Sequence, residues 1–260
     1  MKSPLVSVIV NCHNGQKYLS ECVRSILNQT YKNFEIIFWD NYSTDTSYEI
    51  IKKFKDKRIR KFRLNKFNSL YKSRNLAISM SKGKYLTFCD TDDLWTKNKL
   101  IEQLRLFNRS KHIKFVFSNY FVLNENKKIK YIKFKKKLPE GFITQDLLNN
   151  YMIGILTIML DKKILEKKSF NPKLNIIGDL DLFIKLSTKF KFYYIQKPLA
   201  VYRIHKFNLS SNRLDIYINE LEEWIKINSK NKFLKNHSFL KMKYLLYKLK
   251  VKYFFKKYFN

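Results

Sequence analysis

Three aspartates stand within four residues at the end of an apolar run of the sequence. Asp90, Asp92 and Asp93 follow the uncharged segment 85–89, in a chain whose formal net charge is +32. Clustered carboxylates repel one another unless a cation lies between them. Aspartate oxygens suit Mg²⁺ or Mn²⁺, which commonly bind one or two carboxylates together with phosphate oxygens and water. The cluster therefore indicates a divalent-metal site that carries phosphate, although a surface turn that caps the next helix would have the same composition.

The composition favours a folded globular protein. The chain has 260 residues, of which 45% are hydrophobic and 16% aromatic, so it can bury a core as one large domain or as one domain with an appendage. Glycine and proline are scarce, with 5 and 4 residues, which argues against flexible linkers. The three cysteines are odd in number and lack metal-ligand spacing, so we expect buried thiols in a reducing cytosol.

No targeting or membrane-spanning segment is expected. Residues 1–4 lead directly into a strand pattern, without the apolar segment of a signal peptide. The longest uncharged apolar stretch, residues 151–160, is too short to cross a bilayer. We therefore expect a cytoplasmic protein, either soluble or peripheral at the inner face of the cytoplasmic membrane.

The net charge of +32 allows three explanations. The lysines are scattered over the whole length, which is typical of a lysine-rich genome. Nucleic-acid binding would favour a concentrated basic face and a recognisable module, and neither is evident in the sequence. Attraction to an anionic membrane surface is the third explanation, and the C-terminal segment bears on it.

The first half of the sequence alternates between strand and helix patterns. Strands are predicted over 5–11, 34–40, 59–64 and 85–89, and helices over 19–27, 43–54, 73–81 and 100–107. We expect Ser43 or Thr44 to cap the second helix and Gly83 to end the third. Four β-α units of this size predict an α/β fold with a parallel, doubly wound sheet. Later strands are predicted over 115–123, 129–134, 155–160 and 192–204, and later helices over 180–189, 215–228 and 238–258.

Polar side chains gather in the loops after the first, second and fourth strands. Because ligands bind at the carboxyl ends of such strands, these loops should converge on one crevice. The candidates in these loops are Asn11, His13, Asn14, Asp40, Asn41, Asp90, Asp92 and Asp93. The sequence contains neither a Gly-x-Gly-x-x-Gly turn nor a Walker lysine loop. A metal ion held by carboxylates is therefore the remaining obvious way in which this crevice could bind phosphate.

Several segments, in the same order along the chain, resemble the family 2 glycosyltransferases. The likeness covers roughly residues 4–211. The segments are 6–10 (VSVIV) with Asn14-Gly15 and Tyr18-Leu19, 25–36 (SILNQTYKNFEI), 40–45 (DNYSTD), 73–77 (SRNLA), 83–85 (GKY), 90–95 (DTDDLW), 178–183 (GDLDLF) and 202–205 (YRIH). Any one of these segments would be a weak signal, and their shared order makes the likeness specific.

The resemblance implies a GT-A fold, in which a Rossmann-like and mostly parallel central sheet is flanked by helices. It also implies transfer of a sugar from a nucleotide-sugar, usually with inversion at the anomeric carbon, and UDP is our first choice of nucleotide. The chain would divide into a glycosyltransferase domain over 1–211 and a basic, aromatic, helical C-terminal extension over 212–260. Within the first domain, 1–110 would be the nucleotide-binding half and 111–211 the acceptor-binding half.

The resemblance further implies roles for particular residues in donor binding. The nucleobase and ribose would be lined by Asn11, His13, Asp40 and Asn41, and the ribose and the metal that bridges the diphosphate would be held by Asp90, Asp92 and Asp93. A bound Mg²⁺ or Mn²⁺ would stabilise the negative charge that develops on the departing nucleoside diphosphate. Arg74 would contact the nucleotide or brace the loop that carries Asp90, Asp92 and Asp93, which we call the acidic loop.

Two later residues correspond to functional positions of the family. Asp179 matches the general base that takes the proton of the acceptor hydroxyl, a step that suits a positioned carboxylate; it could instead cap the helix that follows. Asp181 is expected to be a first-turn charge stabilised by the helix dipole. His205 matches a histidine that ligates the metal or contacts the diphosphate, although a lone histidine is usually satisfied by local partners.

Three positions depart from the family's pattern. Asn41 replaces an aspartate, so a base N–H would be accepted by an amide oxygen, which forms a weaker bond than a carboxylate does. His13 stands where tyrosine is frequent, and Gly178 replaces the glutamate that commonly precedes the base. The first two changes bear on the choice of nucleotide, and the third bears on acceptor contacts.

The C-terminal segment is basic and aromatic. No acidic residue follows Glu223, while lysines continue to Lys257. In a helix over 238–258, lysines would separate two apolar stripes on opposite sides. One stripe consists of Leu240, Tyr244, Tyr247, Val251, Phe254 and Tyr258, and the other of Leu245, Leu246, Leu249 and Tyr253. We expect one stripe to dock on the catalytic domain and the other to meet an anionic membrane or a partner; full packing on the domain or in a homodimer is the alternative.

The leading hypothesis is a metal-dependent, inverting glycosyltransferase that extends a surface glycan, such as lipopolysaccharide or capsule, on a glycan or lipid-linked acceptor. A nucleic-acid-binding protein is the rival from another class; it would bind duplex DNA or RNA with strong salt dependence. A nucleotidyltransferase would generally carry a glycine-rich phosphate loop after the first strand, which residues 12–16 do not form. Intact Asp92, Asp93 and Asp179 argue against an inactive scaffold of the same fold.

Overall fold

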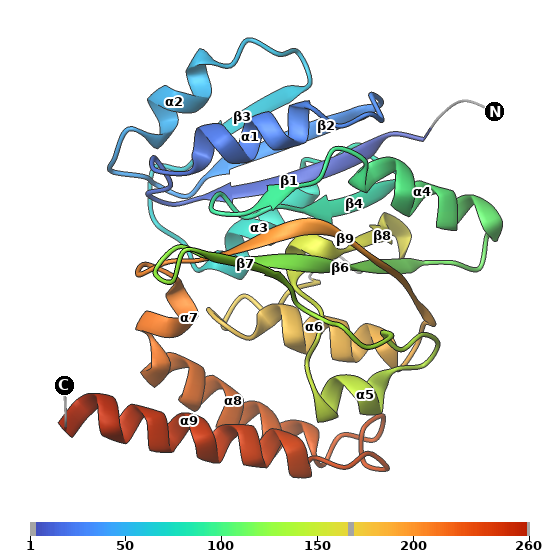
Figure 1. Ribbon diagram of the computed structural model, residues 1–260, viewed down its shortest axis with the longest axis vertical. Coiled ribbons are helices and arrows are strands. Elements are labelled where there is room, and N and C mark those ends of the chain that lie inside the picture. Colours follow the sequence, from blue (N-terminus) through green and yellow to red (C-terminus); the bar gives the residue numbers. More distant parts are fainter. Residues whose placement is uncertain (1–3, 166–168, 259–260) are drawn as a thin grey trace.

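A nine-stranded sheet lies at the centre of the molecule (Figure 1). The computed structural model describes residues 4–165 and 169–258. The strands are β1 (Val6–Cys12), β2 (Phe34–Asp40), β3 (Ile59–Arg63), β4 (Tyr85–Phe88), β5 (Leu94–Trp95), β6 (Phe115–Asn124), β7 (Ile129–Ile132), β8 (Met159–Asp161) and β9 (Phe192–Ile204). The helices are α1 (Leu19–Leu27), α2 (Ser47–Lys53), α3 (Leu70–Ser79), α4 (Lys99–Arg109), α5 (Thr144–Asn149), α6 (Gly178–Ser187), α7 (Leu209–Asn212), α8 (Leu214–Asn228) and α9 (Leu240–Tyr258).

The first half of the chain forms the predicted parallel sheet. β1 pairs in parallel with β2 and β4, and β2 pairs in parallel with β3. Alternation along β1 sends Val6, Val8 and Val10 to the face covered by α1, α2 and α4. Ile9 points to the opposite face, whose apolar core includes residues of α3, α5, α6 and α8. Helices thus cover both faces of the sheet, which explains why these strands read as continuous apolar runs.

The pairing in the second half is mixed. The strand order is β3-β2-β1-β4-β8-β6-β9-β5, with β7 beside β6. β6 and β9 are parallel, whereas β8 pairs antiparallel with β4 and β6, and β5 pairs antiparallel with β9. Of the predicted strand 155–160, Ile155–Thr157 is instead a 3₁₀ turn. The α/β class is confirmed, while the division of the chain after residue 110 stays a prediction.

The second helix begins later than predicted. α2 starts at Ser47, and neither Ser43 nor Thr44 caps it, since Thr46 occupies the N-cap position. The Ser43 hydroxyl instead accepts a hydrogen bond from the backbone N–H of Asn14 at 3.0 Å. The predicted cap residues therefore lie in the loop between β2 and α2, and Ser43 connects this loop to the one that follows β1.

The third helix begins earlier than predicted. α3 starts at Leu70 because the Ser69 hydroxyl caps it, accepting a hydrogen bond from the backbone N–H of Lys72. Gly83 lies beyond the helix end and does not terminate it, since Met80 is the C-cap. A Cβ on Gly83 would lie 2.5 Å from the backbone nitrogen of Ser7. The glycine is needed for this close approach to β1 rather than for helix termination.

The C-terminal helix packs on the domain through one side. On α9, Met242 is buried, and Leu245, Leu246 and Leu249 pack against the core that includes α8. Tyr253, predicted on the same side, is 37% exposed. This agrees with the predicted docking of one apolar stripe, except at Tyr253. Among the described residues, no helix combines the length and apolar character that crossing a bilayer requires.

A lysine side chain lies in the interior, on α4. Lys99 is fully buried, and its Nζ donates hydrogen bonds to Thr87 Oγ1 (2.9 Å) and Gln103 Oε1 (2.7 Å). Nζ also contacts the carbonyl oxygen of Ile158 at 3.3 Å and lies 4.2 Å from the centroid of the Trp95 ring. All of these partners are uncharged, so burial lowers the pKa of Lys99 to about 7.

Replacing Lys99 by methionine is expected to weaken the pH dependence of stability. The unfolded chain keeps this lysine protonated up to about pH 10.4, whereas the folded state releases the proton near pH 7. The free energy of unfolding should therefore rise between these pH values, by at most about 1.4 kcal/mol per pH unit from this group. The check is the Tm of wild type, Lys99→Met and the exposed control Lys241→Met across this range. An equal rise in Tm for all three would contradict the low pKa.

Candidate active site

The three aspartates of the acidic cluster lie on the loop between β4 and β5. The backbone N–H of Asp93 donates to the carbonyl of Asp90 at 3.0 Å, which closes the loop. Arg203 on β9 holds it: its backbone N–H donates to Asp93 Oδ1 (3.1 Å), and its Nε donates to the carbonyl of Asp92 (2.9 Å). The next helix, α4, has Asn98 at its N-cap, so the cluster is not a helix cap.

Arg74 on α3 braces the same loop. Its side chain is almost fully buried, and Nη2 donates to Asp90 Oδ1 at 2.5 Å. Burial alone would lower the pKa of Arg74, but attraction to Asp90 outweighs it and raises the pKa. Arg74 is therefore charged and fixed against the loop, and its contact with a nucleotide stays a prediction.

Asp92 and His205 face each other. His205 Nε2 lies 3.0 Å from Asp92 Oδ2, and His205 is only 8% exposed. Asn208 holds the pair, because its Oδ1 accepts from the backbone N–H of His205 (2.6 Å) and its Nδ2 donates to Asp92 Oδ2 (3.5 Å). Asn208 is not among the predicted site residues. A carboxylate oxygen and an imidazole nitrogen at this spacing could both ligate one divalent cation.

Asp93 is the most buried member of the cluster, with 2% exposure. Burial, followed by the charges of Asp92 and Asp90, raises the pKa of Asp93 well above its usual value. Within residues 4–165 and 169–258, no three His, Cys, Asp or Glu side chains converge on one point that could hold a metal. A metal at this loop would therefore need further ligands from phosphate and water, which is the usual arrangement for Mg²⁺.

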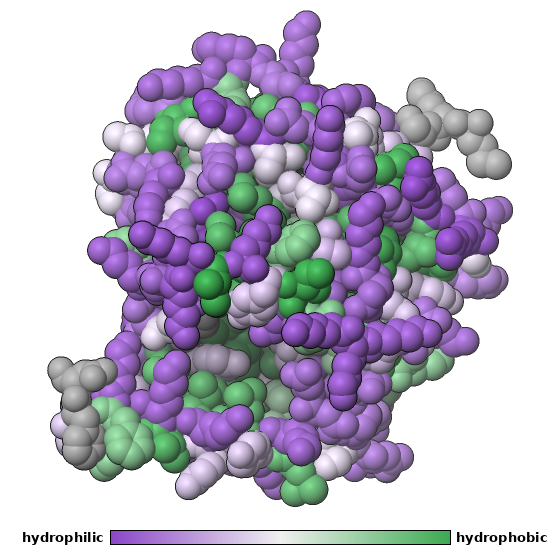
Figure 2. Space-filling model, viewed as in Figure 1, coloured by the Kyte–Doolittle hydropathy of each residue, from purple (hydrophilic) through white to green (hydrophobic). Residues whose placement is uncertain are grey.

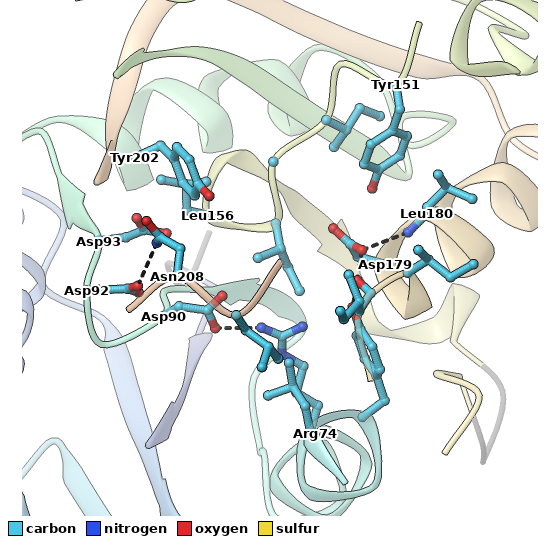
Figure 3. Close-up of a pocket in the computed structure, with 18 of the residues that line it drawn as sticks. Arg74, Asp90, Asp92, Asp93, Tyr151, Leu156, Asp179, Leu180, Tyr202 and Asn208 are labelled. Carbon is cyan, nitrogen blue, oxygen red and sulfur yellow. Dashed lines mark hydrogen bonds and ion pairs between the residues drawn. The ribbon is translucent and has the colours of Figure 1, made fainter. Parts of the chain in front are cut away.

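Asp179, in the first turn of α6, lies across the cavity from the acidic loop (Figure 3). Its Oδ1 accepts hydrogen bonds from the Tyr71 hydroxyl (3.2 Å) and the backbone N–H of Leu180 (2.9 Å). The Tyr151 hydroxyl points toward the same carboxyl group. Desolvation raises the pKa of Asp179, although the Arg74 charge and the hydrogen bonds reduce the effect. This is the environment of a carboxylate with increased basicity.

The residue before Asp179 is glycine because an aromatic ring occupies the space of a side chain. A Cβ on Gly178 would lie 2.5 Å from the ring of Tyr71. Asp179 does not cap α6, since Ile177 occupies the N-cap position. Glycine thus stands at position 178, where the family commonly has glutamate, next to the ring of Tyr71, whose hydroxyl donates a hydrogen bond to Asp179.

Asp181 joins two helices. Its side chain is buried, and Oδ1 accepts a hydrogen bond from Trp224 Nε1 on α8 at 2.9 Å. Oδ2 pairs with Lys185 at 2.7 Å. Asp181 does lie in the first turn of α6, as predicted, but its contacts make it a structural link to α8.

Two of the predicted nucleoside residues contact each other at the ends of β1 and β2. His13 Nδ1 lies 3.0 Å from the carbonyl oxygen of Asn41, and the His13 ring centroid lies 4.7 Å from that of Phe67. Both amide atoms of Asn41 bond to the backbone of Asn68: Oδ1 accepts from its N–H (3.0 Å), and Nδ2 donates to its carbonyl (2.8 Å). The loop before α3 therefore fixes the Asn41 side chain, and its contact with a base stays a prediction.

The other two predicted nucleoside residues, Asn11 and Asp40, are buried polar groups. Asp40 Oδ1 accepts from the backbone N–H of Ser43 (3.1 Å), and Oδ2 lies 3.2 Å from Arg63 Nε. Neither amide atom of Asn11 has a hydrogen-bond partner in the described part of the chain, although Asn11 is only 8% exposed. A buried amide without partners costs about 1–3 kcal/mol. Asn11 thus has bonding capacity that a ligand could fill.

The cavity between the acidic loop and Asp179 has a volume of about 400 Å³. Figure 2 shows a recess between the central sheet and α8 on the face viewed there. Tyrosines dominate the polar lining besides the aspartates: Tyr71, Tyr120, Tyr151, Tyr202 and Tyr217. This size suits a small molecule or part of one. The four predicted nucleoside residues do not line the cavity, which brings together Arg74, the three loop aspartates and Asp179.

Comparison with known families decides the class. The sequence model described as "Glycosyl transferase family 2" matches residues 7–168. The chain belongs to this family. This family 2 glycosyltransferase is therefore an enzyme that transfers sugars, which confirms the predicted class and the resemblance.

Two curated relatives support the assignment. The family 2 glycosyltransferase is 32% identical over 215 residues to TuaG of Bacillus subtilis, a protein named for teichuronic acid biosynthesis, with 81% of this chain and 83% of TuaG covered. It is also 32% identical over 170 residues to WfgD of Escherichia coli, named as a UDP-Glc:alpha-D-GlcNAc-diphosphoundecaprenol beta-1,3-glucosyltransferase, with 65% of each chain covered.

Solved structures confirm the GT-A fold. TarS of S. aureus, residues 1–349 in complex with UDP-GlcNAc, superposes with a TM-score of 0.70 at 17% identity, covering 94% of this chain and 71% of TarS. The mannosyltransferase PcManGT of Pyrobaculum calidifontis, in complex with GDP-Man and Mn²⁺, gives 0.66 at 14% identity, covering 95% and 70%. At these identities the likeness concerns the fold of the family 2 glycosyltransferase.

Proposed function

We propose that this chain is a metal-dependent, inverting glycosyltransferase that moves a sugar from a UDP-sugar to a hydroxyl of a glycan or lipid-linked acceptor. One observation carries the proposal: the Asp179 carboxyl and the acidic loop line opposite sides of one cavity (Figure 3). Inversion requires the attacking hydroxyl and the departing diphosphate to lie on opposite faces of the sugar. A base that faces a phosphate site across a cavity suits this requirement.

The acidic loop would bind the diphosphate end of the donor. Asp92, Asp93 and His205 are the proposed metal residues, and the 3.0 Å approach of His205 Nε2 to Asp92 Oδ2 gives the strongest support for those two. A bound Mg²⁺ or Mn²⁺ would stabilise the charge that develops on the diphosphate. Arg74 would keep the loop in place through Asp90.

The ends of β1 and β2 would bind the nucleoside end. Asn11, His13, Asp40 and Asn41 are the proposed contacts, and the amide of Asn11 without a described partner supports this assignment. Asn41 is held by Asn68 through both amide atoms, so it would present a fixed oxygen to a ligand.

Asp179 would perform the proton transfer. As the acceptor oxygen forms its bond to the anomeric carbon, the bond from that carbon to the diphosphate breaks, and its electron pair leaves with the nucleoside diphosphate. The proton of the acceptor hydroxyl moves to the Asp179 carboxylate. The Tyr71 hydroxyl and the N–H of Leu180 would keep this carboxylate charged and aimed before the reaction.

The names of the relatives support a role in surface-glycan synthesis. TuaG is named for teichuronic acid, and WfgD for transfer from UDP-Glc to a diphosphoundecaprenol-linked sugar. TarS was solved with UDP-GlcNAc, and PcManGT with Mn²⁺. We therefore place UDP-sugars first among donors and a lipid-linked glycan first among acceptors, with the protein peripheral at the membrane.

A panel of nucleotide-sugars tests the proposal. The full chain is incubated with UDP-, GDP-, dTDP- and CMP-sugars, with Mg²⁺, with Mn²⁺ or with EDTA, and nucleotide release is measured. We expect release from at least one UDP-sugar that requires the metal. Absence of release from every donor, or equal release in EDTA, would contradict the proposed donor or the metal requirement.

Removing the Tyr151 hydroxyl is expected to move the pH profile. The Tyr151 hydroxyl, which points toward the Asp179 carboxyl group, lowers the pKa of Asp179, so Tyr151→Phe should raise that pKa. A base is active only when unprotonated, so activity falls as pH drops through its pKa. The acidic limb of kcat/KM against pH should therefore shift to higher pH in this variant. Tyr120→Phe, which also removes a hydroxyl from the cavity lining, is the control and should leave the limb in place.

A further inference from the structure

Large side chains are exposed along the outer side of α9. We call Leu240, Tyr244, Tyr247, Phe254 and Tyr258 the outer stripe. Their exposed fractions are 73%, 57%, 64%, 52% and 62%. The spacing of three, four or seven residues keeps them on one side of the helix. The opposite side of α9 packs on the core, so the helix is apolar on both sides and a second apolar surface is available for contact.

The outer stripe is surrounded by positive charge. α9 contains seven lysines, all exposed, and no acidic residue: Lys241, Lys243, Lys248, Lys250, Lys252, Lys256 and Lys257. Two of them lie over rings of the stripe, with Nζ 4.9 Å from the Tyr244 centroid for Lys248 and 5.5 Å from the Tyr258 centroid for Lys257. The ion pair of Lys250 with Glu222, at 2.6 Å, is on the solvent-exposed surface. A partner of this surface must therefore be both anionic and able to accept apolar groups.

We propose that the outer stripe of α9 lies on the surface of an anionic lipid bilayer. A bilayer combines negatively charged head groups with an apolar layer directly beneath them, and helices with aromatic and basic residues lie in this interface. Tyrosine is favoured at such depths because its ring is apolar and its hydroxyl remains hydrated. At 19 residues the helix would extend about 28 Å along the membrane plane.

Two other partners of the outer stripe, a second copy of this chain and a nucleic acid, fit its combination of positive charge and apolar side chains less well. A second copy of this chain would bring two lysine-rich helices together, and like charges at close range repel. Nucleic acid would satisfy the lysines, but a polyphosphate backbone offers no apolar layer for Leu240 or for the packed rings of Phe254 and Tyr258, whose centroids are 4.8 Å apart.

This surface would set the height of the cavity above the membrane. α9 packs on α8, and Tyr217 of α8 lines the cavity (Figure 1). Packed helices lie about 8–10 Å apart, so α9 and α8 together would place the cavity roughly two helix layers above the lipid head groups. If the acceptor is lipid-linked, as proposed, its glycosyl end could reach Asp179 while its lipid stays in the bilayer.

Vesicle flotation tests the membrane contact apart from the reaction. The full chain is floated with vesicles of phosphatidylcholine alone or mixed with phosphatidylglycerol. The test variant carries Tyr244→Gln, Tyr247→Gln and Phe254→Gln. The control carries Ile129→Gln, Tyr131→Gln and Ile132→Gln, three exposed apolar residues of β7. We expect wild type and control to float with the anionic vesicles, and the partition of the test variant to fall about tenfold or more.

Metal-dependent nucleotide release, measured without vesicles, should be equal in all three proteins. A loss of release in all three with the expected flotation would overturn the proposed reaction and leave the membrane contact standing. Equal flotation of test variant and wild type would overturn the membrane contact. A wild-type protein that stays in the soluble fraction would also overturn the membrane contact. This holds whether the protein then dimerises or binds an oligonucleotide through the outer stripe.

Discussion

The Asp179→Asn variant is expected to lose sugar transfer by about 10³-fold while binding the nucleotide donor normally. An amide cannot take the proton of the acceptor hydroxyl. Its oxygen can still accept from the Tyr71 hydroxyl and the N–H of Leu180, so the shape of the cavity should be retained. The acidic loop, on the other side of the cavity, is untouched by the change. The measurements are the rate of sugar transfer and the Kd for UDP with Mn²⁺.

A neighbouring aspartate provides the matched control for this variant. Asp181 lies on the same helix and is buried, but it contacts Trp224 and Lys185 rather than the cavity. Asp181→Asn keeps an acceptor oxygen for Trp224, and we expect lower stability without a comparable loss of transfer. Transfer by Asp179→Asn at the wild-type rate would remove Asp179 as the base. Equal losses in both variants would assign the effect to folding of α6.

The Asp92→Asn variant is expected to lower kcat/KM by about 10²-fold or more, because a metal supplies several kcal/mol of charge stabilisation at a phosphoryl group. The amide keeps the size of the side chain and an oxygen near His205, but it removes the negative charge beside Nε2. Weaker metal binding should accompany the loss. The check is a titration of activity with Mn²⁺, whose midpoint should move to higher concentration.

The control for Asp92→Asn is Asp215→Asn. Asp215 lies on α8, 42% of its side chain is exposed, and it pairs with Arg213 at the surface. We expect unchanged activity and an unchanged metal midpoint for this control. If Asp92→Asn kept both the wild-type rate and the wild-type midpoint, the acidic loop would not be the metal site.

Continuous apolar runs allowed most of the parallel sheet to be predicted from the sequence. Strand 34–40 was predicted with both ends correct, because polar residues flank the run on each side. The segment 155–160 is equally apolar, yet Ile155–Thr157 forms a 3₁₀ turn in the cavity wall. Periodicity cannot separate a buried turn from a buried strand. The start of α3 depends on a hydrogen bond of Ser69, which composition does not reveal.

Site residues within local motifs were found, and those brought in by the tertiary fold were missed. The aspartates of the acidic loop can be recognised from the sequence alone, because three of them stand within four residues after an apolar run. Asn208 lies three residues after His205, and that spacing is the one clue in the sequence to its contact with Asp92. Tyr71 and Tyr151 reach Asp179 from 108 and 28 positions away, and no sequence pattern links them. The sequence does not reveal why residue 178 is glycine, because the Tyr71 ring that fills the space of a side chain there is distant along the chain.

The bond from the Arg203 backbone to Asp93 joins residues 110 positions apart, and this has a consequence for synthesis on the ribosome. The acidic loop is translated long before the end of β9. Until His205 and Asn208 have emerged, the carboxylate of Asp92 lacks these two side-chain partners. If the acidic loop binds the donor as proposed, a nascent chain that lacks the end of β9 should bind the donor more weakly than the complete chain does. Incomplete polypeptides would then consume less activated sugar than the finished protein does.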